Sequence, residues 1–420
     1  MSSSVALTRE LRFRDPRGLE GFFARSCREL VLKAFDTIIV GRITLRDSHG
    51  TYEFGTAKPG CDLHARVVVF DPKSYVQVAL RGGVGAGESW MEDRWTCDDL
   101  TALARILLRN EGALKALHGP LSKLGMSALK HFQRLRRNTV NGSRRNIAAH
   151  YDLGNEFYRL WLDDTLTYSC GIFADHDQNL QNAQHRKYDA IAEQLQLSDQ
   201  DSVLEIGCGW GGFAVFVAES YGCHVTATTI SREQYRVARE RVRKAGLGDR
   251  VEVLLQDYRK VDGKFDKVVS IEMFEAVGHE YHNAFFTLCA ERMRIGGRML
   301  LQTITIEEDR YKAARHRTDF IQRYIFPGGA LPSDRSLAQA VSRVHGLSLI
   351  ASNEIGPHYA TTLRQWRERF AAVKDAVTQL GFDERFMRMW DFYLCYCEAG
   401  FHERSIGTVQ ALIERTSSTR

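Results

Sequence analysis

A glycine-rich turn directly after a short apolar run is the part of this sequence best suited to holding a cofactor. The run Val203–Ile206 has the composition of a buried parallel strand, and Gly207–Gly212 follows it with the letters GCGWGG. Glycines let the backbone turn sharply and approach a ligand closely, which is why nucleotide-type cofactors lie over such turns at the carboxyl ends of strands. One such turn is a weak signal, because any tight strand-to-helix connection can use glycine.

The residues after the turn strengthen the cofactor interpretation. Val225–Thr229 has the pattern of a second strand about 20 residues on, where folds of this kind place the residue that reads a ribose. The stretch LEIGCGWGG has Glu205 before the turn and lacks the third glycine of the dinucleotide pattern GxGxxG. It resembles motif I of class I S-adenosylmethionine methyltransferases rather than an NAD site. The resemblance implies S-adenosylmethionine as the cofactor.

Strand and helix patterns alternate from about residue 202 onward. Ser231–Ala245 has a helical pattern, and strands are predicted at Val251–Leu255, Lys267–Ile271 and Arg298–Gln302. Such alternation predicts a parallel sheet with helices on both faces. We therefore expect an α/β fold, a Rossmann-like class I methyltransferase domain, joined to a smaller mixed α+β N-terminal domain.

Composition places the chain among globular intracellular proteins. Its 420 residues are enough for two domains, and 44% hydrophobic and 26% charged residues are ordinary proportions. The sequence has no run of 18 apolar residues and no apolar signal core at its N-terminus. Nine cysteines, an odd number, favour reduced thiols in the cytosol over a disulfide framework, and we predict no metal site. The net charge of +5 is mild and decides little by itself.

Residues 1–130 are predicted to form a separate unit. Strand-like Thr37–Leu45 and Thr51–Phe54 flank Asp47–Gly50, which is a hairpin turn signal. Residues 146–420 are then the catalytic domain. Between the two lies a basic stretch, residues 131–145, which reads equally well as a solvated hinge and as a patch that touches anionic lipid headgroups at roughly 1 kcal/mol per residue.

Two smaller features of the N-terminal unit have plain structural interpretations. Gly82–Gly87 could be taken for a phosphate loop, but no Lys-Ser/Thr follows it and Glu88 would repel phosphate. Asp98 can cap a helix that begins near Leu100. Neither feature predicts a binding site.

Aromatic residues gather in two later stretches. Residues 304–333 are too rich in aromatic and apolar side chains to be a solvated linker, and we expect this insertion to cover the active site. Phe386–Phe401 carries an aromatic stripe at helical spacing. A core role is favoured for the stripe, and a channel for an acyl chain is the alternative.

Four blocks of sequence resemble the cyclopropane fatty acid synthases, in the same order and covering about residues 80 to 405. They are Asn146–Phe173, Ser270–Gly278, Tyr324–Ser333 and His358–Phe370. The resemblance implies transfer of a one-carbon unit from S-adenosylmethionine to a cis double bond of an unsaturated phospholipid, without nucleic acid. It further implies a cytoplasmic protein that binds peripherally to the inner face of the membrane, an N-terminal domain that presents lipid, and a homodimer.

The resemblance assigns the cofactor contacts to three regions: the segment before the domain, the glycine turn, and the ends of the second and third strands. These residues are Tyr168, Ser169, Gly207, Gly209, Thr229, Ile230, Gln234, Asp257 and Tyr258. For Tyr168 ordinary aromatic packing is the weaker alternative, because a polar Tyr-Ser-Cys run is poor core material.

In the family that the chain resembles, a bound bicarbonate is the base that completes the reaction. The resemblance assigns its ligands to Cys170, Glu275, Gln302, the backbone amide of Ile304, and Tyr359. Gln302 departs from the family, which has histidine there, so either the base or the product differs. A buried structural thiol is the alternative for Cys170. Glu275 follows a strand at the ligand edge of the sheet, which favours function, whereas Glu272 is an additional acid at this edge with no assigned role.

The chemistry explains why such residues are needed. A cis alkene is a feeble nucleophile, so the sulfonium methyl must be held in line with it and water must be kept from the cation that forms. Aromatic faces suit such a cation, and a base must then remove a proton. A cyclopropane is the expected product. Proton loss from a neighbouring chain carbon, giving a methylene- or methyl-branched chain, is the alternative; a small-molecule methyltransferase and a non-catalytic lipid-binding protein are more remote.

Overall fold

The computed structural model describes residues 13–14, 18–56, 60–117 and 153–417 of the chain. The chain divides into two compact units, neither of them continuous in sequence. The first comprises Met1–Leu135, His316–Ile325 and Lys374–Ser405, and the second comprises Arg136–Arg315, Phe326–Val373 and Ile406–Arg420. The division at residues 131–145 that the sequence suggests therefore does not capture two later segments of the first unit. The predicted basic linker itself lies outside the described residues.

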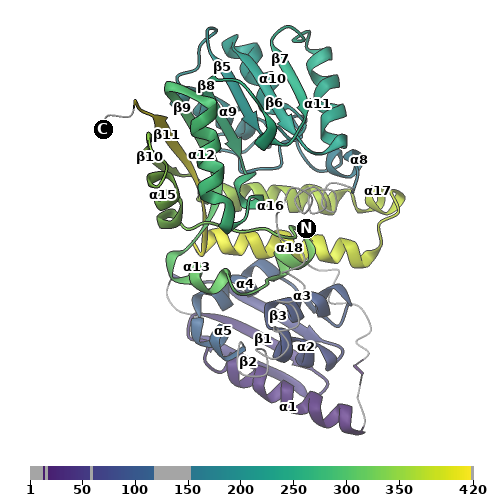
Figure 1. The fold of residues 1–420 in the computed structure, drawn as a ribbon. Coiled ribbons are helices and arrows are strands. Elements are labelled where there is room, and N and C mark those ends of the chain that lie inside the picture. Colours follow the sequence, from purple (N-terminus) through teal and green to yellow (C-terminus); the bar gives the residue numbers. More distant parts are fainter. Residues whose placement is uncertain (1–12, 15–17, 57–59, 118–152, 418–420) are drawn as a thin grey trace. The chain divides into compact units, whose positions relative to one another are not determined.

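The second unit is built on a seven-stranded sheet (Figure 1). In spatial order the strands are β10 (Leu347–Glu354), β11 (Ile406–Arg415), β9 (Met293–Ile306), β8 (Phe265–Ile271), β5 (Ser202–Ile206), β6 (His224–Thr229) and β7 (Val251–Leu255). Strands β5 to β9 run parallel, whereas β11 is antiparallel to both of its neighbours. The predicted α/β fold class is confirmed, and its central parallel strands lie where the sequence places them.

Strand β9 is much longer than the predicted Arg298–Gln302. Its second half pairs with β11, from Arg298 opposite Glu414 to Ile306 opposite Ile406. This pairing depends on a segment about 100 residues further along the chain, so local patterning could not reveal it. The extension carries Ile304 beyond Gln302, at the carboxyl edge of the parallel sheet.

The alternating side chains of the strands fill two cores, one on each face of the sheet. Leu204, Val268 and Met299 point into one core, and their neighbours Val203, Val269 and Leu300 point into the other. Helices α12 (His282–Arg292) and α15 (Asp334–Ser342) cover the first core, and α9 (Leu180–Leu195), α10 (Gly212–Tyr221) and α11 (Arg232–Lys244) cover the second. Because both faces are covered, apolar side chains of the central strands are buried on both sides of the sheet, as in parallel sheets generally.

The remaining helices of the second unit are short or lie at its carboxyl-terminal side. They are α8 (Asn155–Arg159), α13 (Glu308–Ala314), α16 (Gly356–Ala372) and the 3₁₀ turns η2 (Tyr258–Lys260), η3 (Phe274–Ala276) and η4 (His279–Tyr281). In the described part of the chain no helix is long and apolar enough to span a membrane.

The first unit has a four-stranded sheet in the order β2 (Gly50–Thr56), β1 (Gly41–Asp47), β3 (His64–Val69) and β4 (Trp95–Cys97). The hairpin predicted around Asp47–Gly50 is present between β1 and β2. The helices of the unit are α1 (Gly18–Phe35), α2 (Lys73–Arg81), α3 (Gly83–Met91), α4 (Leu100–Arg109), α5 (Glu111–Leu117), α14 (Phe320–Tyr324), α17 (Lys374–Gln379) and α18 (Glu384–His402). The cap predicted for α4 is wrong by one residue: the Asp99 side chain accepts from the Ala102 amide, while Asp98 accepts from the Arg66 amide.

The glycine run at residues 82–87 is helical rather than a phosphate loop, since α3 begins at Gly83. Glu88 on this helix is buried and accepts from Tyr324 of α14 at 2.7 Å, and Arg323 lies 3.0 Å away. Part of the aromatic insertion at residues 304–333 thus belongs to the core of the first unit. The stripe predicted on α18 also has its favoured core role, because Trp390 and Tyr393 are buried there.

Gly87 is expected to be intolerant of any side chain. A Cβ at this position would lie 2.4 Å from the ring of Phe320 and 3.0 Å from that of Phe392, so the helices would have to separate. We expect Gly87→Ala to lower the free energy of unfolding by about 1–3 kcal/mol in urea titrations, the usual cost of overpacking. Gly83→Ala on the same helix, where a Cβ meets no atom within 4 Å, is the matched control and should not destabilise the protein. Equal stability of the two variants would contradict this packing.

Candidate active site

The glycine turn connects β5 to α10 and is hydrogen-bonded to the adjacent strand β6. The amides of Gly207 and Cys208 both donate to the carbonyl of Thr228, at 3.0 and 2.9 Å. Gly207 and Gly209 have φ of +82° and +53°, a region that residues with a Cβ rarely adopt. A Cβ on Gly209 would meet no protein atom within 4 Å, so the turn borders open space there. The predicted cofactor turn has the open backbone that close approach of a ligand requires.

Glu205 lies at the end of β5, immediately before this turn. Its side chain is buried, and burial raises the pKa of its carboxyl to about 8. Atom Oε2 has no hydrogen-bond partner among the described residues. A buried carboxylate oxygen without a partner is costly unless a ligand satisfies it, and the ammonium of S-adenosylmethionine has the right charge. The residues present therefore fit this cofactor.

Lys187 is a fully buried lysine that the sequence analysis missed. Its Nζ donates to the hydroxyl of Ser169 at 2.7 Å, while Gln184 donates to the Ser169 carbonyl at 3.0 Å. Burial lowers the pKa of Lys187 to about 8, and the charge of Lys187 offsets part of the rise that burial causes in the pKa of Glu205 and Glu272. Lysine at a helical position gives no sequence signal of burial, so only the packing of α9 reveals it.

The predicted contacts after β6 lie on the strand adjacent to β5. Thr229 donates to the side-chain oxygen of Gln234 at 2.9 Å and accepts from the Ser231 amide, and Thr229 and Gln234 are both buried. Ser231 caps α11 by accepting from the Gln234 amide. Ile230, between these residues, is half-buried. The structure thus brings Thr229, Ile230 and Gln234 together beside the glycine turn.

The predicted adenine contacts follow β7, one strand further along the sheet. Asp257 caps the turn η2, and its carboxylate accepts from Arg259 Nε and Nη2 at 2.9 and 2.7 Å. Tyr258 packs edge-on against Phe285 with ring centroids 5.6 Å apart. Both residues therefore lie at the same edge of the sheet as the turn, with the Asp257 carboxylate already engaged by Arg259.

Aromatic rings connect the cofactor turn to the predicted catalytic residues. Around the Tyr168 ring, with centroids 5.0 to 6.1 Å away, lie the rings of Trp366, Tyr158, Trp161 and Phe326. The Tyr158 ring lies 5.0 Å from that of Trp210 in the turn, and the Trp366 ring lies 6.0 Å from that of Tyr359. Such a cluster presents negatively polarised ring faces and excludes water, as a cationic reaction requires.

The structure also brings together three of the residues assigned to bicarbonate, but they surround the side chain of Glu272. Glu272 accepts from the Cys170 amide at 2.9 Å, from Gln302 Nε2 at 2.9 Å and from the Tyr359 hydroxyl at 2.6 Å. The Ile304 amide donates to Glu275 at 2.5 Å. Glu272, to which the sequence analysis gave no role, is therefore at the centre of the set.

The thiol of Cys170 faces away from this set. Sγ lies 3.3 Å from the carbonyl oxygen of Gly171 and 3.6 Å from that of Ile355, and burial raises the pKa of the thiol well above its usual value. Cys170 contributes its backbone amide to the site, which agrees with the structural alternative for its side chain.

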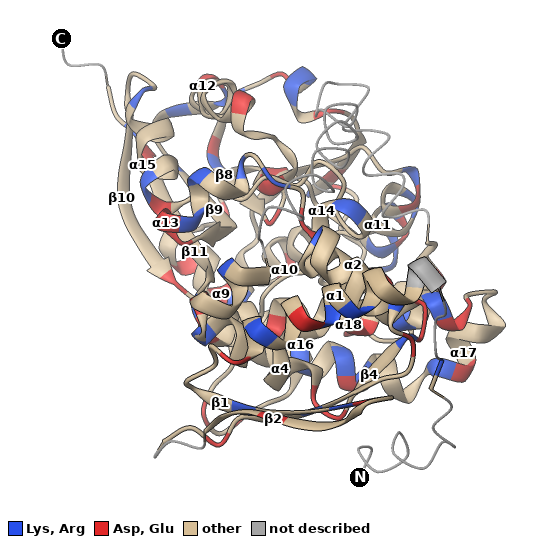
Figure 2. Cartoon of the chain, turned by 90° about the horizontal axis from the view of Figure 1, so that it is seen from below, with Lys and Arg blue, Asp and Glu red and all other residues tan. Residues whose placement is uncertain are grey.

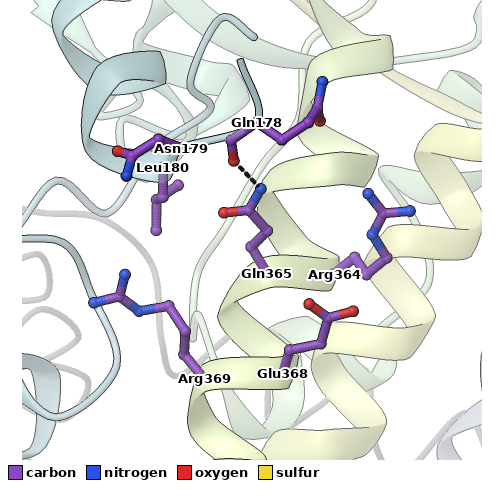
Figure 3. A pocket seen from close by; sticks show the side chains of 7 residues that line it. All are labelled: Gln178, Asn179, Leu180, Arg364, Gln365, Glu368 and Arg369. Atoms are coloured by element: carbon purple, nitrogen blue, oxygen red, sulfur yellow. Dashed lines mark hydrogen bonds between the residues drawn. The ribbon is translucent and has the colours of Figure 1, made fainter. Parts of the chain in front are cut away.

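A surface hollow of about 510 Å³ lies apart from the predicted residues (Figure 3). It is lined by Gln178, Asn179, Leu180, Arg364, Gln365, Glu368 and Arg369. Gln365 Nε2 donates to the carbonyl of Gln178 at 2.6 Å, and Arg369 donates to the carbonyl of Leu162 at 2.6 Å. None of the predicted site residues lines this hollow, and the chemistry of the chain is not assigned to it.

A family model and two relatives with known names show the family of this chain. Residues 139–411 match the family model described as mycolic acid cyclopropane synthetase. The chain is 39% identical to the tuberculostearic acid methyltransferase UfaA1 of Mycobacterium tuberculosis, over 86% of each protein. It is 36% identical to the cyclopropane-fatty-acyl-phospholipid synthase of Escherichia coli, over 84% of this chain and 88% of that protein.

Solved structures agree with these similarities. The mycolic acid cyclopropane synthase CmaA1, crystallised with SAH and CTAB, is 33% identical and superposes with a TM-score of 0.61, covering 65% of this chain and 98% of its own. The cyclopropane synthase MmaA2 of Mycobacterium tuberculosis is 29% identical with a TM-score of 0.60, over 64% of this chain and 97% of its own. The predicted family is confirmed. This chain is a member of the mycolic acid cyclopropane synthetase family and an S-adenosylmethionine-dependent methyltransferase.

Proposed function

We propose that this enzyme transfers a one-carbon unit from S-adenosylmethionine to a cis double bond in an unsaturated phospholipid acyl chain, with a cyclopropane as the main product. The observation that carries the proposal is the cluster of aromatic rings from Trp210 through Tyr168 to Tyr359, which ends at the carboxylate of Glu272. The similarity to the Escherichia coli phospholipid synthase, over most of both chains, supports the same substrate class.

Each part of the site has a task in this reaction. S-adenosylmethionine supplies an electrophilic methyl carbon when it is bound. The glycine turn, Thr229 and Gln234 orient it, and the rings around Tyr168 keep water away while a cation exists on the acyl chain. A carboxylate then accepts the proton whose loss completes the product. Family resemblance gives the role of base to a bound bicarbonate.

A branched acyl chain is the second candidate product. It is favoured by the departure at Gln302, because glutamine cannot take up a proton, and by the carboxylate of Glu272 beside it. The relatives do not choose between ring and branch, since one at 39% identity is named a methyltransferase and one at 36% a cyclopropane synthase.

Transfer of a labelled methyl carbon tests the proposal. Vesicles of cis-monounsaturated phosphatidylglycerol should gain the label in their acyl chains, and vesicles with the same headgroup and saturated chains should not. Label in small amines or alcohols alone would point to a small-molecule methyltransferase. Binding of S-adenosylmethionine without any turnover would point to a lipid-binding protein.

Peripheral binding to the inner face of the membrane, presentation of lipid by the N-terminal unit and a homodimer belong to the same proposal. Helix α1 supports binding to the membrane, because Phe22 and Phe23 are 66% and 44% exposed, and Leu30 on the same helix is 48% exposed. Exposed phenylalanines on a helix that also carries Arg25 and Lys33 suit an anionic lipid surface. The helix also carries the exposed acid Glu29, so its charge is less decisive than its phenylalanines. On α11 basic residues are paired with acidic ones, Arg236 with Glu233 and Arg243 with Glu240 (Figure 2).

Replacing Phe22 and Phe23 by serine is expected to weaken binding to anionic vesicles on the order of 10²-fold or more, since each inserted aromatic side chain contributes roughly 1.5–3 kcal/mol. Co-sedimentation with vesicles measures this binding. Ile295→Ser, which removes an equally exposed apolar side chain from the second unit (67% exposed), is the matched control and should bind as the wild type does. If the double variant sediments like the control, α1 does not dock on the membrane.

A further inference from the structure

Glu272 has a backbone conformation that glutamate rarely adopts. It follows β8 with φ of +49°, and its amide donates to the carbonyl of Gln302 at 2.8 Å. A residue with a Cβ is strained in this left-handed region, whereas glycine adopts it freely. Such a conformation persists where the surrounding structure holds the residue in place, and these places are often functional. A turn alone does not account for a glutamate with positive φ at position 272.

Three donors hold the carboxylate of Glu272 in place. Oxygen Oε1 accepts from the Cys170 amide and from Gln302 Nε2, both at 2.9 Å, and Oε2 accepts from the Tyr359 hydroxyl at 2.6 Å. Family resemblance assigns these three residues to bicarbonate. Bicarbonate and a side-chain carboxylate present similar planar, anionic oxygen acceptors, so they compete for the same donors. The donors present do not fit an additional bicarbonate, because Glu272 already engages them.

A chain of amide side chains fixes the orientation of Gln302. The Gln302 oxygen accepts from Gln410 at 3.0 Å, the Gln410 oxygen accepts from Gln194 at 2.7 Å, and the Gln194 oxygen accepts from Asn353 at 3.0 Å. Since each amide oxygen is occupied by the preceding donor, the NH₂ group of Gln302 must face Glu272. Linked hydrogen bonds of one direction strengthen one another. Gln302 is thus a fixed donor to a carboxylate and carries no proton of its own.

Glu275 supplies the second half of the arrangement. Its Oε1 accepts from the Ile304 amide, and Oε2 is buried without a partner among the described residues. Burial, together with the charge of Glu272, raises the pKa of the Glu275 carboxyl to about 8. Burial raises the pKa of Glu272 as well, and its three donors offset only part of that rise. Two neighbouring buried carboxyls do not readily ionise together, and three donors hold the Glu272 carboxylate against one for Glu275, so the proton resides on Glu275 and the charge on Glu272.

We propose that the Glu272 carboxylate is the base of the reaction and stands in the place that family resemblance gives to bicarbonate. The inference rests on the proposed function. As the alkene electron pair forms a bond to the methyl carbon, the carbon–sulfur bond breaks with its pair on sulfur, and the positive charge passes to the acyl chain. Glu272 then takes a proton, and the electron pair of that C–H bond closes the ring or forms the new double bond. The proton leaves to water afterwards, which restores the carboxylate.

Bicarbonate depletion and two variants of Glu272 test this inference. The rate of label transfer to cis-unsaturated phospholipid should be the same for the wild type in CO₂-free buffer and after bicarbonate is added. Glu272→Gly should lose on the order of 10²-fold or more in CO₂-free buffer, the usual cost of losing a positioned base. Because glycine suits a φ of +49° and frees the three donors, added bicarbonate or formate should restore part of the rate.

Glu272→Gln is the matched control. It has the size of glutamate and accepts no proton, so its rate should fall as far and added anions should not restore it. Calorimetry with S-adenosylhomocysteine verifies that both variants still fold; if the glycine variant does not, the glutamine variant decides. Three results would overturn the inference: full activity of Glu272→Gln, dependence of the wild type on bicarbonate, or equal rescue of both variants. If the wild type labels no acyl chain under any condition, the proposed function itself fails and the inference with it.

Discussion

Gly209→Val is expected to abolish binding of S-adenosylhomocysteine while leaving the fold intact. The Gly209 backbone has φ of +53°, and a side chain there would project into the open space where we place the cofactor. The isopropyl group would occupy that space, and close backbone approach would be lost. Titration calorimetry is expected to show no binding, and circular dichroism an unchanged spectrum.

Backbone strain alone could mimic this effect, so the control must carry the same strain. Gly246 also has positive φ, +70°, and a Cβ there meets no atom within 4 Å, but it lies in the turn between α11 and β7. Gly246→Val should lower stability by about 1–2 kcal/mol, as a left-handed residue with a Cβ does, and still bind the ligand. Equal affinity of the two variants would mean that the turn does not hold the cofactor.

Lys187→Met is expected to lower both stability and activity strongly. Lys187 is fully buried, and its charge offsets part of the rise that burial causes in the pKa of Glu205 and Glu272. Methionine fills similar space but removes the hydrogen bond to Ser169 and the positive charge that favours the ionised Glu272, and leaving a buried charge uncompensated costs about 3–5 kcal/mol. The pKa of Glu272 should rise, so less of it is available as a base and the rate should fall on the order of 10²-fold. Thermal denaturation and the label-transfer rate measure the two effects.

Lys244→Met is the matched control, since the Lys244 side chain is 72% exposed and makes only a surface pair with Glu240. Its stability and rate should equal those of the wild type. A Lys187→Met enzyme that is as stable and as active as this control would show that the buried charge contributes nothing.

Local sequence was enough to predict the cofactor part of the fold. Val203–Ile206 and the glycine turn are specified by composition and spacing over about ten residues, and β5, the turn and α10 lie where these patterns place them. The ends of β6 and β7 were predicted for the same reason. Parallel strands bring their carboxyl ends to one edge, so Thr229 and Gln234 had to lie near the turn once the sheet was recognised.

The base arrangement could not be predicted in this way. Cys170, Gln302 and Tyr359 are far apart in sequence, and nothing local indicates that all three donate to Glu272. The signal that the sequence offered was Glu272, a second acid directly after β8, but its role depends on these three donors. The burial of Lys187 likewise results from tertiary packing, which local sequence does not indicate. The two later segments of the first unit, His316–Ile325 and Lys374–Ser405, likewise join it through long-range contacts.

The most direct test of the central claim is the fate of a trideuterated methyl group. The enzyme is incubated with S-adenosylmethionine labelled in this way and with vesicles of a cis-monounsaturated phospholipid, and the released acyl chains are analysed by mass spectrometry. We expect acyl chains that have gained one carbon atom. A cyclopropane keeps two deuterium atoms and no double bond, whereas proton loss from a neighbouring chain carbon keeps all three deuterium atoms and leaves a double bond. Acyl chains that carry no deuterium, from an enzyme that binds S-adenosylhomocysteine normally, would contradict the account.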